Sequence, residues 1–296
     1  MHDVSAWITL PGLALGVALL CALLYPLHRR LQQRHQRQLR LNITQLSLLR
    51  ELIGGWQRHR GLSNGLLCGD NSLSQDLAAV RLQVDDHLLQ ATRLSGNQQA
   101  AWASLFDHWS RLRDVRNSDP ANNLAQHHLI IRNAIFLMED IASEFDLSQG
   151  RSELSYLPCI WHEVIQAAEW AGQARALGTG IAAARHSSAE QRVRLRFLKQ
   201  KIEQLSRSAF TTLHNHEQCR RFNLMRGEQT VLSFLRCIDQ ELLNVEQPGI
   251  AAKAYFQCAT LAIDELLALI DVALRHLQET GRGATTGNSQ AKKNPD

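Results

Sequence analysis

The 296-residue chain has only six prolines, few β-branched residues, and no long stretch in which apolar and polar residues alternate. These absences argue against a β-sheet, because half-buried strands need that alternation and favour β-branched side chains. Long stretches rich in Leu, Ala, Gln and Arg run between the prolines and favour helices. Hydrophobic residues make up 45% of the chain, which is typical of a globular protein. We therefore predict an all-α fold.

The chain also lacks the motifs of common catalytic and metal sites. None of its six cysteines forms a Cys-x-x-Cys pair, and scattered thiols suit a reducing compartment better than a disulfide framework. There is no glycine-rich phosphate loop and no Gly-x-Ser-x-Gly elbow. His162-Glu163 lacks the second histidine of a zinc-protease helix. We predict neither enzymatic activity nor a metal or cofactor.

An uncharged segment near the N-terminus, from Val4 to Leu27, is dense in Leu, Ala, Val and Ile. About 20 apolar residues cross a bilayer as a helix. Trp7 and Tyr25 stand near the two ends, where aromatic side chains prefer the membrane interface. The following flank has no small-x-small cleavage site, unlike a removable signal peptide. We predict an uncleaved transmembrane anchor at residues 1–28.

The arginines after this segment set its predicted orientation. Five of them precede the first acidic residue of that region: Arg29, Arg30, Arg34, Arg37 and Arg40. The positive-inside rule then places the N-terminus outside a bacterial inner membrane and the rest of the chain in the cytoplasm. Because basic residues beside a membrane segment are a topology signal, we do not predict nucleic-acid binding. Gly12 and Gly16 form a small-xxx-small pattern that would permit a homodimer.

Periodic apolar residues divide the rest of the chain into helices. Residues 29–42 are predicted to form a basic juxtamembrane helix, and the polar residues 280–296 a disordered tail. Between them, turn signals separate two consecutive sets of predicted helices, at 43–67, 74–94, 97–115 and 121–144 and then at 155–184, 189–212, 214–245 and 250–279. We therefore predict two consecutive antiparallel four-helix bundles over residues 43–279, preceded by one transmembrane helix.

Two arginines occupy the apolar faces of their predicted helices. Arg60 follows Trp56 at helical spacing, and Arg175 follows Ala168 and Gly172 in the same way. A guanidinium does not lose its proton in a protein, and burying it without a partner is strongly unfavourable. Each arginine therefore needs a buried carboxylate, several carbonyls, or a bound anion.

The two arginines also open similar strings of six residues, Arg-Gly-Leu-Ser-Asn-Gly and Arg-Ala-Leu-Gly-Thr-Gly. A guanidinium is a planar fork of donors, so two forks from two bundles would hold a small planar anion such as nitrate or nitrite. Ser63 and Thr179 would add hydroxyl donors, and the small residues would let a helix or a ligand approach closely. The alternative is a helical scaffold whose arginines pair with buried glutamates such as Glu169 or Glu228.

Three motifs in the chain resemble the NIT family, the nitrate- and nitrite-sensing domain of bacterial signalling proteins. Residues 56–63, Trp-Gln-Arg-His-Arg-Gly-Leu-Ser, are similar to the family's Leu-Gln-x-Glu-Arg-Gly-x-Ser, with His59 in place of glutamate. Residues 169–176 match the pattern Glu-x-x-Gly-x-x-Arg-Ala. Residues 255–264 are similar to a late, aromatic-rich helix that contains Ala-Thr and Ile-Asp. The resemblance spans about residues 44 to 278.

The resemblance implies a double helical bundle with nitrate held by arginines from both bundles. By position, Arg60 and Arg175 match best, Arg236 or Arg226 from the late helices would complete the site, and Arg58 is the alternative on the first helix. No kinase, cyclase, chemoreceptor or RNA-binding antitermination signature occurs in these residues. We therefore expect a membrane-anchored cytoplasmic sensor that signals to a separate, unknown partner protein.

Overall fold

The computed structural model describes the backbone of residues 5–94, 98–114, 119–149 and 154–290. Within these ranges, the side chains of residues 5–18, 145–149, 221 and 281–290 are not described. Every regular element in the described ranges is a helix, which confirms the all-α prediction.

The first four long helices form one set, which we call the N-terminal helix group. It consists of α1 (Ser5–Leu67), α2 (Ser74–Ala91), α3 (Gln99–Leu112) and α4 (Pro120–Gln149). α1 packs against α2 and α4, and α3 packs against α4. A short 3-10 turn, Asn71–Leu73, leads from α1 into α2, and the Asp70 side chain caps it by accepting from the Ser72 amide.

The remaining helices form the C-terminal helix group. A short α5 (Leu157–Cys159) and a π-helical turn (Ile160–Val164) lead into α6 (Ile165–Ala184), which is followed by α7 (Ala189–His214). A 3-10 turn (Glu217–Arg221) precedes α8 (Leu224–Ile238), a second π-helical turn (Asp239–Leu243) ends it, and α9 (Ala252–Gln290) is last. Ser188 and Gln191 form a capping box that begins α7.

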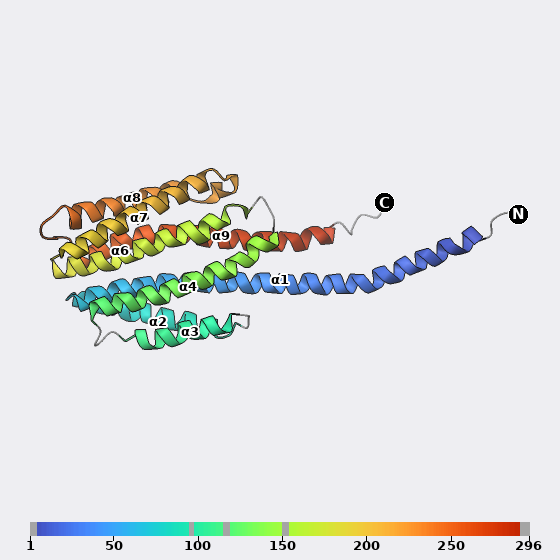
Figure 1. Ribbon diagram of the computed structural model, residues 1–296, viewed down its shortest axis with the longest axis horizontal. Helices are drawn as coiled ribbons and strands as arrows, with labels where there is room; N and C mark the ends of the chain where they lie inside the picture. Colours follow the sequence, from blue (N-terminus) through green and yellow to red (C-terminus); the bar gives the residue numbers. More distant parts are fainter. Residues whose placement is uncertain (1–4, 95–97, 115–118, 150–153, 291–296) are drawn as a thin grey trace.

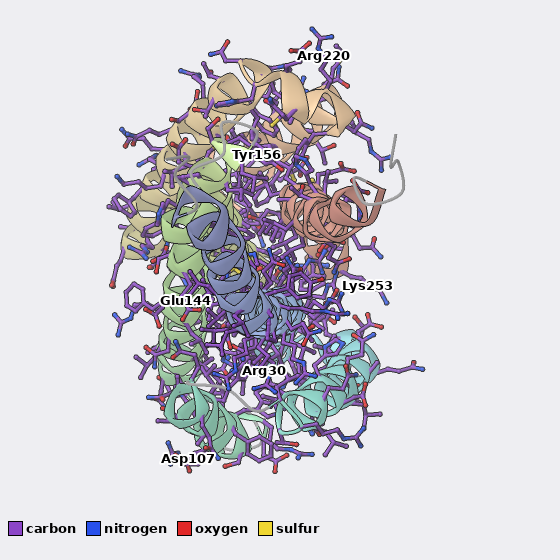
Figure 2. All side chains as sticks on the ribbon, turned by 90° about the vertical axis from the view of Figure 1, so that its right-hand side faces the viewer. Arg30, Asp107, Glu144, Tyr156, Arg220 and Lys253 are labelled. Atoms are coloured by element: carbon purple, nitrogen blue, oxygen red, sulfur yellow. The ribbon has the colours of Figure 1, made fainter. Side chains whose placement is uncertain are left out.

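The C-terminal third of α1 lies between the two groups, because α1 also packs against α6 and α9. Viewed along the helices, α4 lies on one side of α1 and α9 on the other (Figure 2). Leu46, Leu49, Leu52, Ile53 and Trp56 are all fully buried here. A helix that is buried on nearly every side must have neighbours all round it. For this part of α1 the neighbours are α2, α4, α6 and α9. The rest of α1 extends away from both groups towards the N-terminus (Figure 1).

Two predicted boundaries differ from the structure. Residues 29–42 are not a separate helix, because α1 continues through them into the interior without a break. Likewise α9 continues to Gln290, beyond Thr280, where we predicted that a disordered tail begins. In both places no proline interrupts the helix, and each added residue contributes one more hydrogen bond to a helix that has already formed. Residues 291–296 lie outside the described residues.

The predicted anchor at residues 1–28 falls mostly on residues 1–18, whose side chains lie outside the described part of the chain. The pair Gly12 and Gly16 lies there too. Among the residues that the structure describes, no helix combines the length and the apolar character needed to span a membrane.

Candidate functional site

Arg60 and Arg175 both point into the interior, and each is 0% exposed. Arg60 lies on α1 and Arg175 on α6, two helices in close contact where the two helix groups meet. We call the region where α1, α6 and α9 pack together the seam. The prediction that both arginines face inward is confirmed.

A carboxylate neutralises Arg60 from across the seam. Arg60 Nη1 donates to Glu169 Oε1 at 2.7 Å, and Nη2 donates to Oε2 at 3.1 Å. Of the three partners that the sequence left open for Arg60, the structure shows a buried carboxylate, and the alternative pairing with Glu169 is confirmed. Helical spacing identifies the buried face, but the partner comes from another helix 109 residues away. The other acidic candidate, Glu228, is exposed and lies 3.9 Å from His214.

Glu169 is the centre of a wider polar network. Its Oε2 also accepts from Gln57 Nε2, and its Oε1 from Gln173 Nε2, both at 3.0 Å. Arg194 from α7 in turn donates to Gln173 Oε1 at 2.8 Å. Each carboxylate oxygen thus accepts two hydrogen bonds, which is how a buried charge becomes tolerable.

The surroundings of Arg175 are different. Its Nη1 donates to Thr260 Oγ1 at 2.8 Å, and its guanidinium carbon lies 4.7 Å from the centre of the Phe256 ring. Within the described part of the chain, Arg175 has no carboxylate partner, and its Nε and Nη2 make no hydrogen bond. The Nε–H and one Nη2–H lie along the same edge of a guanidinium. Arg175 therefore presents two parallel free donors, the arrangement that binds planar oxyanions.

Burial, and after it the nearby positive charges of Arg58 and Arg60, lower the pKa of Arg175 to about 9. Asp264 and Glu169 oppose this shift. A guanidinium with this pKa remains protonated at neutral pH. Since Arg60 and Glu169 cancel, the interior of the seam carries one excess positive charge, and it resides on Arg175.

Glycines bring the three helices of the seam together. A Cβ atom on Gly172 would lie 2.7 Å from Arg60 Nη2, and one on Gly61 would lie 2.8 Å from Phe256 Cε2. A Cβ on Gly178 would collide with the Tyr255 ring, whose hydroxyl donates to the Ala174 carbonyl at 3.1 Å. For Gly61 and Gly178, the prediction that the small residues after each arginine allow another helix to approach closely is confirmed.

The two predicted hydroxyl donors are buried, but they bond to the main chain. Ser63 Oγ donates to the Arg60 carbonyl at 3.1 Å, and Asn123 Nδ2 donates to Ser63 Oγ at 3.0 Å. Thr179 Oγ1 donates to the Arg175 carbonyl at 2.7 Å. Both hydroxyls therefore donate back to the carbonyl of the arginine on their own helix, a common pattern for Ser and Thr inside helices.

His59, which stands where the family motif has glutamate, turns away from Arg60 into the N-terminal helix group. His127 Nδ1 lies 2.7 Å from the Asn123 carbonyl, which can only accept, so this nitrogen carries the proton. His127 Nε2 then accepts from His59 Nδ1 at 2.8 Å. Burial, then the Arg81 charge, lowers the pKa of His59 to about 3, and burial and His59 lower that of His127 well below its usual value. Both histidines are neutral.

The other predicted arginines lie outside the buried site. Arg58 forms a half-exposed ion pair with Asp264 at 2.8 Å. Arg226 is exposed and pairs with Glu265 at 2.7 Å. Arg236 is exposed too, and its Nη2 donates to Ser233 of its own helix at 3.3 Å.

The late-helix arginines miss the seam because α8 buries a different stripe, made up of Leu224, Gly227, Val231, Phe234, Leu235 and Ile238. We expected Arg226 or Arg236 to complete the buried site, but both side chains lie exposed on α8, away from Arg60 and Arg175. Thr260 and Phe256 of α9 contact Arg175 instead. The signal for them was present in the sequence, since both lie within the aromatic-rich motif at residues 255–264.

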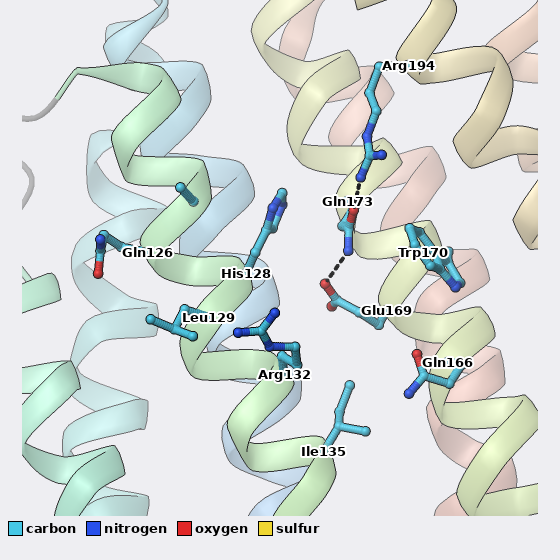
Figure 3. A pocket seen from close by; sticks show the side chains of 11 residues that line it. Gln126, His128, Leu129, Arg132, Ile135, Gln166, Glu169, Trp170, Gln173 and Arg194 are labelled. Carbon is cyan, nitrogen blue, oxygen red and sulfur yellow. Dashed lines mark hydrogen bonds between the residues drawn. The ribbon is translucent and has the colours of Figure 1, made fainter.

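A pocket of about 520 Å³ lies between α4, α6 and α7, beside the polar network of Glu169. Figure 3 shows Glu169 at its edge on α6, with Arg132 and His128 opposite on α4. Its lining comprises Ala125, Gln126, His128, Leu129, Arg132, Ile135, Gln166, Glu169, Trp170, Gln173 and Arg194. Glu169 thus borders the pocket and also accepts the hydrogen bonds of Arg60 in the seam.

Comparisons with known proteins agree with the motifs. A family model described as nitrate and nitrite sensing (NIT) matches residues 51–278. Among solved structures, the chain is similar to the NasR transcription antiterminator, with 23% identity and a TM-score of 0.58 over 88% of this chain and 73% of that one. At that identity the likeness concerns the fold alone. No curated protein sequence matches.

Proposed function

Because the chain belongs to the nitrate- and nitrite-sensing (NIT) family, which is a signal-sensing family, we propose that it binds nitrate or nitrite at the seam. In this proposal the anion occupies the free edge of Arg175 and reaches Arg60 across the seam. The observation that carries it is a fully buried arginine with no carboxylate partner among the described residues and with two parallel donors unused.

The chemistry of the seam fits such an anion. Nitrate and nitrite are planar and singly charged, so one ion would cancel the excess charge on Arg175 and accept both of its free hydrogen bonds. Chloride could cancel the charge, but it is a single spherical acceptor. It cannot offer a separate oxygen to each of the two parallel donors, as a planar oxyanion does. The fit therefore predicts selectivity for planar oxyanions.

We further propose that the two helix groups act as two four-helix bundles whose contact responds to the anion. Arg60 belongs to one group and Arg175 to the other, so an anion held by both would stabilise one relative placement of α1 and α6. A ligand shifts such an equilibrium only by the difference between its affinities for the two states. An anion that bridges Arg60 and Arg175 binds more tightly when α1 and α6 hold both arginines within its reach, so its affinity differs between the two states.

The proposal includes an N-terminal membrane anchor and a separate partner protein. Supporting the anchor, α1 extends beyond the packed groups and exposes Leu19, Leu20, Leu23 and Leu24, and the basic residues after position 28 would lie at the cytoplasmic face of a bacterial inner membrane. Because α1 is one continuous helix, a shift at the seam would reach the membrane-proximal end and any homodimer contact there. The partner that receives the signal is unidentified.

Calorimetric titration and thermal unfolding of the purified full chain with sodium nitrate test this function. At a hundredfold excess over the dissociation constant, nitrate should stabilise the fold by about 2.7 kcal/mol, and chloride at equal ionic strength should do far less. Arg175→Met should abolish nitrate binding. Arg226→Met is the matched control, because that arginine is exposed on α8, and it should bind nitrate like the unchanged protein. Equal responses to nitrate and chloride would contradict the proposal.

The ion pair between Arg60 and Glu169 favours a second candidate, a helical scaffold whose anion site has degenerated. In that case the polar seam serves only to define how the groups pack. The scaffold predicts no nitrate-specific heat or stabilisation in any variant, so the same titration separates the two functions.

A further inference from the structure

The fork of Arg60 already holds a planar oxyanion, the carboxylate of Glu169. We propose that Glu169 is an internal competitor for the Arg60 fork, and that the pocket between α4, α6 and α7 receives its carboxylate when an external anion binds. This inference rests on the proposed nitrate or nitrite site. It adds that Glu169 sets the anion concentration at which the site fills.

The competition concerns the Nη1–Nη2 edge of Arg60. Both Nη atoms donate to Glu169 along that edge, and the Nε atom makes no hydrogen bond in the described structure. An anion that bridges Arg175 and the Nη edge of Arg60 must therefore take the place of at least one carboxylate oxygen. Carboxylate and nitrate have the same planar arrangement of oxygens, so the fork fits both equally well.

The pocket gives the displaced carboxylate a place to go. Glu169 is only 8% exposed, yet its side chain borders a space of about 520 Å³. A carboxylate turning towards that space would regain water and approach the opposite wall on α4 (Figure 3). It would not remain as a buried unpaired charge, which is the costly outcome.

The opposite wall of the pocket carries the positive charge of Arg132. Arg132 of α4 lines the pocket, is exposed, and pairs with no carboxylate in the part of the chain that is described. His128, its neighbour on the same wall, adds no charge, since burial and then the charges of Arg60 and Arg194 lower its pKa to about 3. Arg194 is already engaged with Gln173. Arg132 is therefore the group that would attract the released carboxylate.

The exchange would move contacts from one helix pair to another. In the structure, Glu169 links α6 to α1 through Gln57 and Arg60. After release it would link α6 to α4 through Arg132. The exchange would also raise the anion concentration at which the site fills, because each binding event must first break a bidentate ion pair.

Calorimetric titration of sodium nitrate into the full chain and three variants tests the competition. Glu169→Gln keeps the size of the side chain, removes its charge and replaces one accepting oxygen with an NH2 group, so it holds Arg60 less strongly and nitrate should bind about tenfold or more tightly. Arg132→Gln removes the attraction in the pocket, so nitrate should bind several-fold more weakly. Arg196→Gln, an exposed arginine of α7 that does not line this pocket, should leave the affinity unchanged.

Opposite signs for the first two variants separate a competitor from a residue that only supports the fold. Nitrate binding that weakens or stays equal in Glu169→Gln would overturn the competition while leaving the nitrate site standing. Should that variant not fold, an unchanged affinity in Arg132→Gln would overturn the competition alone. Binding by Glu169→Gln but not by the unchanged protein would support it strongly, and binding by neither would end both proposals.

Discussion

The seam contains two fully buried arginines with opposite surroundings. Around Arg60, the carboxylate of Glu169 and the amides of Gln57 and Gln173 form a connected network. Around Arg175, one hydroxyl and one aromatic ring are the only partners among the described residues, and two donors remain unused. Burial of an arginine therefore does not identify a ligand site. We therefore base the proposed site on the donors of Arg175 that its described neighbours leave unused.

The largest expected difference in stability is between a variant that lacks the charge of Arg60 and one that lacks the charge of Arg175. Arg60→Met would leave Glu169 as an unpaired buried carboxylate, which should lower the free energy of unfolding by about 3–5 kcal/mol. Arg175→Met would remove a buried charge that has no carboxylate partner among the described residues, so stability should hold or rise. Equilibrium unfolding in urea, followed by far-ultraviolet circular dichroism, measures both. Equal losses would mean that Arg175 has an ion-pair partner after all, and the contrast between the two sites would disappear.

Acid should destabilise the N-terminal helix group, which carries Arg60, through His59 and His127. Their folded pKa values are lowered, to about 3 for His59, whereas the unfolded chain takes up protons near pH 6.5. Stability is therefore complete above pH 6.5 and falls as the pH drops towards 3, because the unfolded state binds protons that the folded state does not. Between pH 7 and 5 the expected loss is about 2 kcal/mol for each histidine that stays neutral. Urea unfolding at both pH values measures it.

The matched control for this pH effect is the double variant His59→Leu, His127→Leu. It should show a clearly flatter dependence of stability on pH over the same range. An identical dependence would assign the acid sensitivity to other groups and not to the buried pair.

A methyl group placed beside Arg60 tests how tightly the network is packed. Gly172→Ala would put a Cβ atom 2.7 Å from Arg60 Nη2 and 3.2 Å from Gln57, so one of these side chains must move. The expected cost is about 1–3 kcal/mol. Gly249→Ala is the control, because a Cβ there meets nothing within 4 Å and the backbone angle is not strained. Equal thermal unfolding midpoints for the two variants would show that the seam tolerates added volume.

The smallest effects are expected at the arginines that lie outside the seam. Arg226→Ala and Arg236→Ala should each change stability by no more than about 0.5 kcal/mol, since exposed ion pairs contribute little. Their nitrate titrations should match that of the unchanged protein. Loss of nitrate binding in either one would mean that α8 rearranges to bring an arginine into the site.

Much of the architecture could be predicted from local patterns. The helical segments follow from apolar residues at steps of three and four, and the same spacing correctly turned Arg60 and Arg175 inward. The helices α1 and α9 continue through residues 42 and 280, because a change from apolar to polar composition alters what a helix packs against without breaking its hydrogen bonds. The late-helix arginines were misplaced because a match by position does not identify which face of α8 is buried.

The sequence by itself determined the all-helical fold, the NIT motifs, and the inward direction of two positive charges. Only the tertiary structure decided that Arg60 has a carboxylate partner while Arg175 keeps two free donors. The physical reason is that helical periodicity is a property of neighbouring residues, whereas the partner of a buried charge depends on how α1, α6 and α9 pack. Glu169 and Thr260 reach their arginines from 109 and 85 residues away.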